Sequence, residues 1–406
     1  MSCPGLKDKA GKDVKLCLND FLLSGPDLVN RLVGVLLRMR RHPVVISSDI
    51  KAFFHRIFVD SKDSPSFRFY WFADKKLKRM IILEMIVHIF GAKSSPCVAT
   101  YVLRYHGHSL KGQISEETLY AILKAFYVDD LLSSQPDVAM ARAVRIELQE
   151  SLLKGGFELA KWKCTHCGAL ANADDKAAAE AEEKMLEDPS TEVPVEKVLG
   201  VSYSFQADKF CIKVGKRVEQ KTNTRRELLS LVASVFDPMG FVCPATLRGK
   251  IHFQKATSLE LGWDDGMPGD LQTEVDEWKG DLHQLVNLKI DRWMATVATT
   301  KGKVQLHMFS DASPDAYGIA GYVRFFTGDE IHVALIFARA HVVPLDMSRR
   351  IIAGQEDHHN SMPKLELTAA KLGASVADML VRELEKEITF DQVYMWTDSE
   401  TILKWI

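Results

Sequence analysis

The pattern of hydrophobic and polar positions predicts that helices and short strands alternate in the first half of the chain. Apolar side chains recur at helical spacing in residues 28–37, 117–126 and 138–153. A β-rich run, Val44–Ser47, stops at Asp49, and two apolar segments meet at the pair Asp129 and Asp130, as in a tight hairpin. The pattern thus predicts three carboxylates at the ends of strands.

The second half becomes richer in strands near residue 295, where we expect a domain boundary. Before it, we predict a β-region at 198–214, helices at 225–236 and 271–288, and a loop at Asp237–Gly240. After it, we predict strands at 304–309, 318–326 and 392–396 and a helix at 365–384. Residues 169–193, rich in Ala, Glu, Asp and Lys, predict an exposed helix and linker. The resulting parts are 1–168, 169–195, 196–295 and 296–406.

Composition is typical of globular domains and adds little about function. The 406 residues are 47% hydrophobic and 26% charged, and the net charge of −2 does not indicate a nucleic-acid binder. The apolar stretch Met80–Ala92 is too short to span a bilayer, and the N-terminus has no secretory signal. The 7 cysteines form no disulfide framework. We therefore expect a soluble, intracellular protein without a membrane partner.

Three local clusters could bind ligands, but their ordinary structural explanations are favoured. Two are basic: one comprises Arg31, Arg38, Arg40, Arg41 and His42, and the other Lys213, Lys216, Arg217, Lys221, Arg225 and Arg226. Each is expected to be a solvated surface unless it flanks a catalytic cleft. The third is the run Cys164-Thr165-His166-Cys167. It lacks a second ligand pair, so we assign no zinc to it.

The acids at 49, 129 and 130 fit metal-dependent nucleotidyl transfer. Two-metal sites need carboxylates from separate strands, close enough to share two Mg²⁺ ions. Mg²⁺ prefers oxygen ligands and keeps several waters, so two or three acids suffice. Because successive side chains in a strand face opposite ways, we expect Asp129 to be the main ligand of the pair.

The context of these acids resembles a known family. Ser47-Ser48-Asp49-Ile50-Lys51-Ala52-Phe53-Phe54, Phe90-Gly91-Ala92-Lys93-Ser94-Ser95-Pro96 and Tyr127-Val128-Asp129-Asp130 resemble motifs A, B and C of reverse transcriptases, in that order. Leu18-Asn19-Asp20, Ser24-Gly25-Pro26-Asp27-Leu28, Gly155–Trp162, Leu199-Gly200-Val201 and Ser230–Pro244 are similar to segments of the BEL/Pao group of LTR retrotransposons. The resemblance covers the chain from about residue 15.

The resemblance implies roles for individual residues. The metal ligands would be Asp49, Asp129 and Asp130, assisted by the carbonyl of Ile50. Phe54 would block a ribose 2′-OH. Residues near the template and incoming base would be Gly91, Ser95 and Pro96. The general acid that protonates the pyrophosphate leaving group would be Lys161 or Lys163. The implied cofactor is Mg²⁺, with Mn²⁺ possible, and the implied partners are an RNA/DNA template-primer and deoxynucleoside triphosphates.

A second set of acids follows the order of ribonuclease H domains. Asp311 ends a strand-like run, Glu366 begins a helix, and Asp398 follows another strand. The same two-metal chemistry would apply. The fourth acid of that fold is missing before Ile406, and the stretch Met347–Ser361 is longer than usual. We therefore expect this part to be inactive as given.

The fold we expect is α+β. It comprises a right-hand polymerase palm with an antiparallel sheet and truncated fingers (1–168), a linker (169–195), the end of the palm with thumb and connection (196–295), and an incomplete ribonuclease H-like α/β domain (296–406). The expected function is RNA-directed DNA synthesis for a retroelement, in a cytoplasmic particle. The alternative is a non-catalytic, degraded or domesticated fragment that binds nucleic acid. A retroviral-type protease is excluded because neither Asp-Thr-Gly nor Asp-Ser-Gly occurs. The sequence leaves the oligomeric state unknown.

Overall fold

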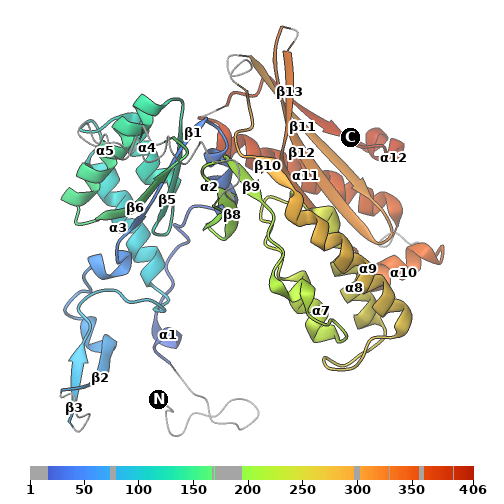
Figure 1. The fold of residues 1–406 in the computed structure, drawn as a ribbon, viewed down its shortest axis with the longest axis horizontal. Helices are drawn as coiled ribbons and strands as arrows, with labels where there is room; N and C mark the ends of the chain where they lie inside the picture. The colour runs from blue at the N-terminus through green and yellow to red at the C-terminus, as the bar shows by residue number, and fades with distance from the viewer. Residues whose placement is uncertain are drawn as a thin grey trace. The chain divides into compact units, whose positions relative to one another are not determined.

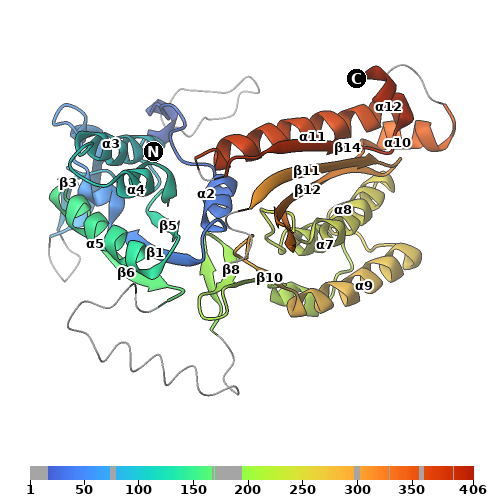
Figure 2. The ribbon, with the colours of Figure 1, turned by 90° about the horizontal axis from the view of Figure 1, so that it is seen from above.

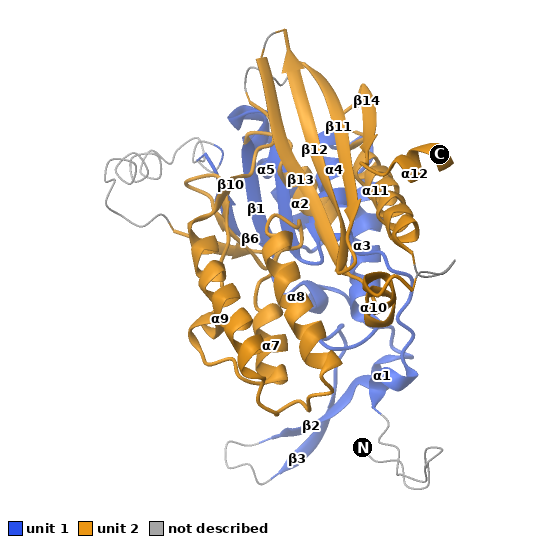
Figure 3. Ribbon diagram, turned by 90° about the vertical axis from the view of Figure 1, so that its right-hand side faces the viewer, with its two compact units in different colours: residues 1–31, 44–180 blue, residues 32–43, 181–406 orange. Residues whose placement is uncertain are grey.

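The chain folds into two compact units, coloured separately in Figure 3. A computed structural model describes residues 17–73, 79–166, 169, 194–296, 302–328, 330–355, 361–386 and 388–406. One unit comprises residues 1–31 and 44–180, and the other comprises residues 32–43 and 181–406. The predicted linker at 169–195 lies almost wholly outside the described residues.

The first unit is built on a four-stranded sheet in the order β4-β5-β1-β6. Its strands are β1 (Val44–Ile50), β4 (Phe126–Tyr127), β5 (Asp130–Gln135) and β6 (Leu159–Cys164). Its helices are α1 (Leu18–Phe21), α3 (Ser95–Ser109), α4 (Glu116–Tyr120) and α5 (Val138–Lys154), with 3₁₀ turns η1 (Phe53–Arg56) and η2 (Ser64–Phe67) and a π-helix, η3 (Ala121–Ala125). The predicted strand at 44, the hairpin at 129–130 and the helix at 138 are confirmed.

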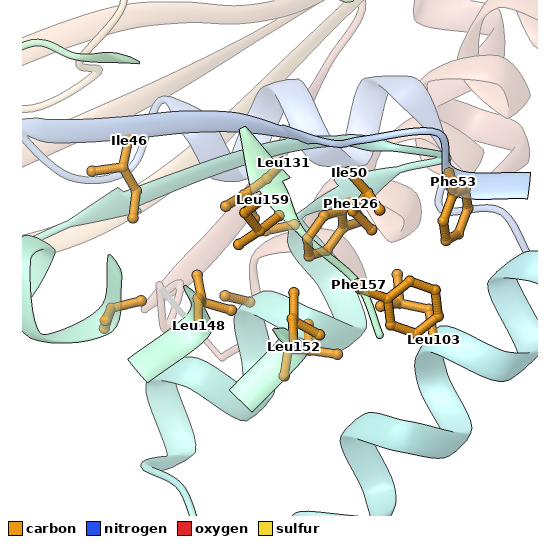
Figure 4. Close-up of a cluster of buried hydrophobic side chains, with 14 of the residues drawn as sticks. Ile46, Ile50, Phe53, Leu103, Phe126, Leu131, Leu148, Leu152, Phe157 and Leu159 are labelled. Atoms are coloured by element: carbon orange, nitrogen blue, oxygen red, sulfur yellow. The ribbon is translucent and has the colours of Figure 1, made fainter. Parts of the chain in front are cut away.

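One face of this sheet packs on the helices and forms the core of the unit. Ile46 and Ile50 of β1 lie with Leu131 of β5 against Leu148 and Leu152 of α5, as Figure 4 shows. Because side chains alternate along a strand, the residues between these core positions point to the opposite face. Burial of the core face therefore fixes which residues of β1 stay available for chemistry.

A two-stranded ribbon, β2 (Arg68–Phe72) and β3 (Met80–Glu84), extends from the first unit (Figure 1). Every residue of β2 is exposed. A two-stranded hairpin has no core of its own and is marginally stable in water. The large exposed apolar side chains of this ribbon are Phe69, Tyr70, Trp71, Phe72, Met80, Ile82 and Leu83.

The second unit contains two four-stranded sheets. The smaller one has the order β10-β9-β8-β7, with β7 (Glu196–Val198), β8 (Val201–Ser204), β9 (Lys209–Cys211) and β10 (Lys289–Asp291). The larger one has the order β13-β12-β11-β14, with β11 (Lys303–Ala312), β12 (Ala316–Thr327), β13 (Glu330–Val342) and β14 (Gln392–Trp396). Pairing is antiparallel except between β11 and β14, which are parallel. A mixed α/β fold with antiparallel sheets is thus confirmed.

Helices surround these sheets. They are α2 (Leu32–Met39), α7 (Arg225–Val232), α8 (Cys243–Ser258), α9 (Gly269–Gln284), α10 (Leu345–Ile352), α11 (Met362–Leu384) and α12 (Glu400–Trp405), with 3₁₀ turns η5 (Lys216–Glu219) and η6 (Leu285–Asn287). Figure 2 shows α11 running along the sheet of β11 and β12, which it contacts. Sequence patterns did not predict α3, α8 or β13. The boundary near residue 295 stays a prediction.

Helices α7, α8 and α9 pack around one tryptophan. Trp278 of α9 is fully buried, and its indole N–H donates to the carbonyl of Ala245 at 2.8 Å. A Cβ on Gly249 of α8 would lie 2.3 Å from the Trp278 ring. Glycine at 249 therefore allows the two helices to approach closely.

A buried arginine, Arg292, ties the end of α2 to the smaller sheet. Its guanidinium forms a bidentate pair with Asp208 and donates to the carbonyls of Met39, His42 and Pro43. Arg292 has no exposed surface. A buried guanidinium is tolerated only when its donors are satisfied, and here the planar fork meets both a carboxylate and backbone acceptors.

Arg40 completes this junction. It is 1% exposed and donates to the carbonyls of Arg292 and Leu335. Burial, then the charge of Arg292, lowers the pKa of Arg40 to about 9, so it remains charged at neutral pH. Arg38, also buried, pairs with Glu383 of α11. The expectation of a solvated basic surface is therefore wrong for Arg38 and Arg40, which are structural.

Removing the Arg292 guanidinium should be costly. Arg292→Leu leaves the partly buried Asp208 carboxylate and three backbone carbonyls without the Arg292 donors, so we expect the free energy of unfolding to fall by about 3–5 kcal/mol. Arg226, which forms an exposed bidentate pair with Asp264, provides the control, and Arg226→Leu should cost at most about 1 kcal/mol. Urea unfolding followed by tryptophan fluorescence measures both. An equal decrease in the free energy of unfolding for both variants would contradict a larger contribution from the buried pair.

Candidate functional site

The register of β1 with β5 brings two predicted acids together. Asp49 pairs directly with Asp130 in this antiparallel ladder, and the amide of Ile50 donates to the carbonyl of Asp129 at 2.9 Å. Residues directly opposite each other project on the same side of the sheet. Ile50 and Leu131 occupy the core face, so Asp49 and Asp130 project from the opposite face. Asp49 and the adjacent pair Asp129 and Asp130, which are far apart in sequence, are thus brought to the same end of the sheet.

The hairpin that carries Asp129 contains a strained residue. Tyr127 pairs with Asp130, which leaves Val128 and Asp129 as a two-residue turn. Val128 has φ of 59°, as at the first central position of a type II′ turn, where glycine is preferred. Positive φ is rare for a β-branched residue, and such strain clusters at functional sites.

This turn also changes the prediction about the two acids. A regular strand would send Asp129 and Asp130 to opposite faces, but Asp129 lies in the turn and only Asp130 belongs to β5. Asp130, not Asp129, is the direct cross-strand neighbour of Asp49. The preference for Asp129 as main ligand therefore stays a prediction that the strand argument no longer supports.

Lys161 lies at a bulge in β6 and reaches the same acids. The pairing of β1 with β6 shifts register between Ser47 and Asp49, and Lys161 has φ of 55°. Bulges often redirect a side chain beside an active site. The Lys161 ammonium donates to Asp49 Oδ2 at 2.6 Å, although 75% of its side chain is exposed. Lys161 is thus the cation nearest to this acid.

The electrostatics reflect the crowding of like charges. Partial burial raises the pKa of Asp129, and the Asp49 carboxylate raises it further. Partial burial also raises the pKa of Asp130, followed by the charges of Asp129 and Asp49. Asp49 accepts a hydrogen bond from Lys161 and thereby raises the pKa of that amine. Excess negative charge at this point favours binding of a cation.

The donor set fits Mg²⁺. Asp49 Oδ1 is buried and has no hydrogen-bond partner, whereas its Oδ2 meets Lys161. An unsatisfied buried carboxylate oxygen is costly, and a bound cation would satisfy it. In the described ranges, no three His, Cys, Asp or Glu side chains are grouped so that they could hold a metal ion by themselves. Mg²⁺ commonly uses only one or two carboxylates, with waters and substrate phosphates completing its shell.

The ring of Phe54 lies just beyond β1. It is 7% exposed and belongs to the core of the first unit. Its ring meets the largely exposed ring of Phe90 edge-on, with centroids 4.9 Å apart. Phe54 is therefore a core aromatic whose accessible edge is shared with Phe90, a contact that sequence reasoning did not foresee.

The predicted base-binding loop is held by Asn19, whose contacts with this loop the sequence did not indicate. The Asn19 amide donates to the carbonyl of Gly91 at 2.8 Å and accepts from the amide of Lys93 at 2.8 Å. Gly91 has φ of 85° and open space where a Cβ would lie. Pro96 occupies the first turn of α3. The loop thus presents backbone at Gly91.

Ser95 contributes to this loop from within. It is 1% exposed, and its hydroxyl donates to the carbonyl of Ile89 at 2.8 Å and contacts the ring of His88. The hydroxyl is therefore used inside the protein. A role for Ser95 in substrate binding stays a prediction.

The second set of acids converges at one end of the larger sheet. β11 and β14 are parallel with Phe309 beside Trp396, and Asp311 and Asp398 each lie two residues further along. Both acids line a pocket of about 570 Å³. Ser399, adjacent to Asp398, donates a hydrogen bond to Glu366 of α11. The sheet and α11 therefore gather Asp311, Glu366 and Asp398, in the order the sequence indicated.

The second basic cluster is only partly available for ligands. The Arg226 guanidinium pairs with Asp264, and Arg225 donates to the carbonyl of Leu261 and lies over the Trp263 ring. Arg217 and Lys221 line a pocket of about 240 Å³. Cys167, part of the run to which no zinc is assigned, lies outside the described residues. None of the described helices is long and apolar enough to cross a membrane.

Neutralising one acid should stabilise the first unit. A carboxyl whose pKa is raised by folding binds its proton more tightly when folded, so stability falls as pH rises above the unfolded value of about 3.9. We expect Asp130→Asn to melt roughly 1–3 °C above the parent chain at pH 7, and the gap to shrink toward pH 4. Lys161→Met should melt lower.

Thermal unfolding at both pH values measures this effect. Asp137→Asn is the control, because asparagine caps α5 as well as aspartate does. A lower melting temperature for Asp130→Asn at pH 7 would contradict charge crowding at the site.

Comparison with known proteins relates the fold to viral enzymes. The foamy viral protease-reverse transcriptase in complex with an RNA/DNA hybrid matches with a TM-score of 0.51 and 13% identity, over 93% of this chain and 42% of that one. Two further structures of that protein match at 13% identity and cover 99% of this chain. For the dRH form in complex with double-stranded DNA, the TM-score is 0.53 and the match covers 59% of that chain. For the protein in complex with double-stranded DNA, the TM-score is 0.52 and the match covers 70% of that chain.

At this identity the likeness shows the fold alone, and the chain spans about two fifths of the first relative. A search of curated proteins gave no match. Residues 224–399, which include Asp311, Glu366 and Asp398, match the family described as the Pao retrotransposon-like RNaseH-like domain. The resemblance to the BEL/Pao group is thereby confirmed over residues 224–399, which are similar to a Pao retrotransposon-like RNaseH-like domain, and this match is consistent with a retroelement polyprotein.

Proposed function

We propose that the chain is a reverse transcriptase of a retroelement, with its polymerase site at Asp49, Asp129 and Asp130. The β4-β5-β1-β6 sheet would be the palm, and α7, α8 and α9 the thumb and connection. The observation that carries this proposal is the pairing of Asp49 with Asp130 on the free face of that sheet. The buried, unpartnered Asp49 Oδ1 supports a metal there.

The residues of this site would divide the work of nucleotidyl transfer. Asp49, Asp129 and Asp130 would hold Mg²⁺, with the Ile50 carbonyl assisting. When bound, the metal supplies charge stabilisation at the transferred phosphoryl group and activates the primer hydroxyl. The Lys161 amine, kept protonated by Asp49, would donate a proton to the pyrophosphate leaving group. Its largely exposed position gives it freedom to leave Asp49 for the phosphates.

The surroundings of the acids would select the substrate. Phe54, with Phe90 on its edge, would exclude the ribose 2′-OH and so favour deoxynucleotides. The exposed backbone at Gly91, followed by Ser95 and Pro96, would lie near the template and incoming base. Backbone phosphates would contact Lys216, Arg217 and Lys221, and such contacts are sensitive to salt and blind to sequence. The enzyme would work in a cytoplasmic retroelement particle.

Primer extension tests the proposed polymerase. On poly(rA) primed with oligo(dT), the chain should incorporate dTTP when Mg²⁺ or Mn²⁺ is present. Asp49→Asn and Asp129→Asn should each lower the rate by at least about 10²-fold, because each removes a carboxylate that holds the charge-stabilising metal. Asp137→Asn is the folded control.

The alternative function gives a different result in the same experiment. A degraded or domesticated fragment would bind the template-primer in a gel-shift assay without incorporating nucleotide. No incorporation by folded parent chain would therefore overturn the polymerase proposal.

The ribonuclease H-like site is expected to bind a hybrid without cleaving it. Asp311, Glu366 and Asp398 provide three of the four acids that its fold uses. Incubation of a labelled RNA/DNA hybrid with the chain and Mn²⁺ should leave the RNA intact. Cleavage that disappears in Asp311→Asn, but not in Asp49→Asn, would show that three acids suffice.

A further inference from the structure

The hairpin that carries Asp129 is weakly supported by the sheet itself. β4 contains only Phe126 and Tyr127 and lies at the edge of the sheet, so on one side of it no strand of the described residues is paired. It follows directly on the π-helix η3, and the last carbonyls of a helix have no partner within it. Strain such as that at Val128 persists only when the surrounding structure holds the backbone firmly.

The side chain of Asn30 supplies support at this junction. Its amide nitrogen donates to the carbonyl of Phe126 at 2.8 Å and to that of Leu123 at 3.1 Å. Its amide oxygen accepts from the Arg104 guanidinium at 2.9 Å. Asn30 thus satisfies one carbonyl in η3 and one in β4, on both sides of the junction between the helix and the hairpin.

Arg104 fixes the orientation of this amide. It belongs to α3, the helix that begins at Ser95, immediately after the loop held by Asn19. Because a guanidinium can only donate, the oxygen of Asn30 must face Arg104 and its nitrogen must face the two carbonyls. The half-buried amide therefore joins the segment before β1, helix α3 and the catalytic hairpin.

We propose that Asn30 is a positioning residue that holds the Val128–Asp129 turn in the geometry that metal binding requires. The expected effect on rate rests on the proposed function. The hydrogen bonds of Asn30 to Leu123, Phe126 and Arg104, which we call the clamp, are a property of the fold. The backbone of Asp129 is held on its far side by the Ile50 amide, so loss of Asn30 frees only the β4 side. A misplacement of about 1 Å can cost on the order of 10²-fold in rate.

Three variants and one control give a distinctive order of effects. Asn30→Ala removes both donated hydrogen bonds, and we expect kcat to fall by roughly 10–10²-fold with KM for dTTP changed less than about threefold. Asn30→Asp should be worse, because its carboxylate faces two carbonyls that it repels. Arg104→Ala should be milder, because the amide keeps both carbonyls. Gln113→Ala removes an exposed amide that bonds the Ser109 carbonyl and should change nothing.

Hydrogen–deuterium exchange separates this inference from the polymerase proposal. Amides of residues 126–132 should exchange faster in Asn30→Ala than in the parent chain. In Gln113→Ala, their exchange rates should be unchanged. If the parent chain incorporates no nucleotide, the polymerase proposal fails but the exchange result still decides on the clamp. Unchanged exchange in Asn30→Ala, or a loss of kcat matched by an equal rise in KM, would overturn it.

Discussion

The pairing of β1 with its two neighbours determines what the first unit can do. Ile46 and Ile50 must face the helices for the core to form, and this requirement sends Asp49 to the other face. A slip of one residue would reverse both sets of side chains. Hydrophobic burial thus sets the register, and the register brings Asp49 opposite Asp130. One face of β1 contributes to the core and the opposite face carries Asp49. A change in the register of β1 would therefore alter both the core and the site.

Much of the candidate site could be predicted from the sequence because its acids lie next to strong local patterns. Asp49 ends a β-rich run, Asp398 follows a strand, and the hairpin at Asp129 lies between apolar segments. Side-chain contacts were not accessible in the same way. Nothing in the local sequence around Asn19 or Asn30 indicates a carbonyl more than seventy residues away. The bulge that redirects Lys161 also has no glycine to mark it.

The basic residues show why burial is difficult to infer from composition. The two basic clusters have similar local composition, but their side chains differ in burial. Arg38 and Arg40 are buried, whereas Arg217 and Lys221 line a pocket. The difference arises from acceptors that the tertiary structure supplies, such as the Leu335 carbonyl for Arg40. Helices α3 and α8 were missed for a related reason. Each has a weak amphipathic pattern and carries proline in its first turn, which also reads as a turn signal.

The short segment 32–43 has a practical consequence. It belongs to the second unit, although residues of the first unit precede and follow it. Its last carbonyls are acceptors for Arg292, and Arg40 reaches β13. Dividing the chain at one point would therefore not give two fragments that each fold. The N-terminal fragment would contain helix α2 without the unit it packs on, and the C-terminal fragment would bury Arg292 without its carbonyl acceptors. Testing the two proposed sites separately will require point variants, or co-expression of the missing dodecapeptide with the larger fragment.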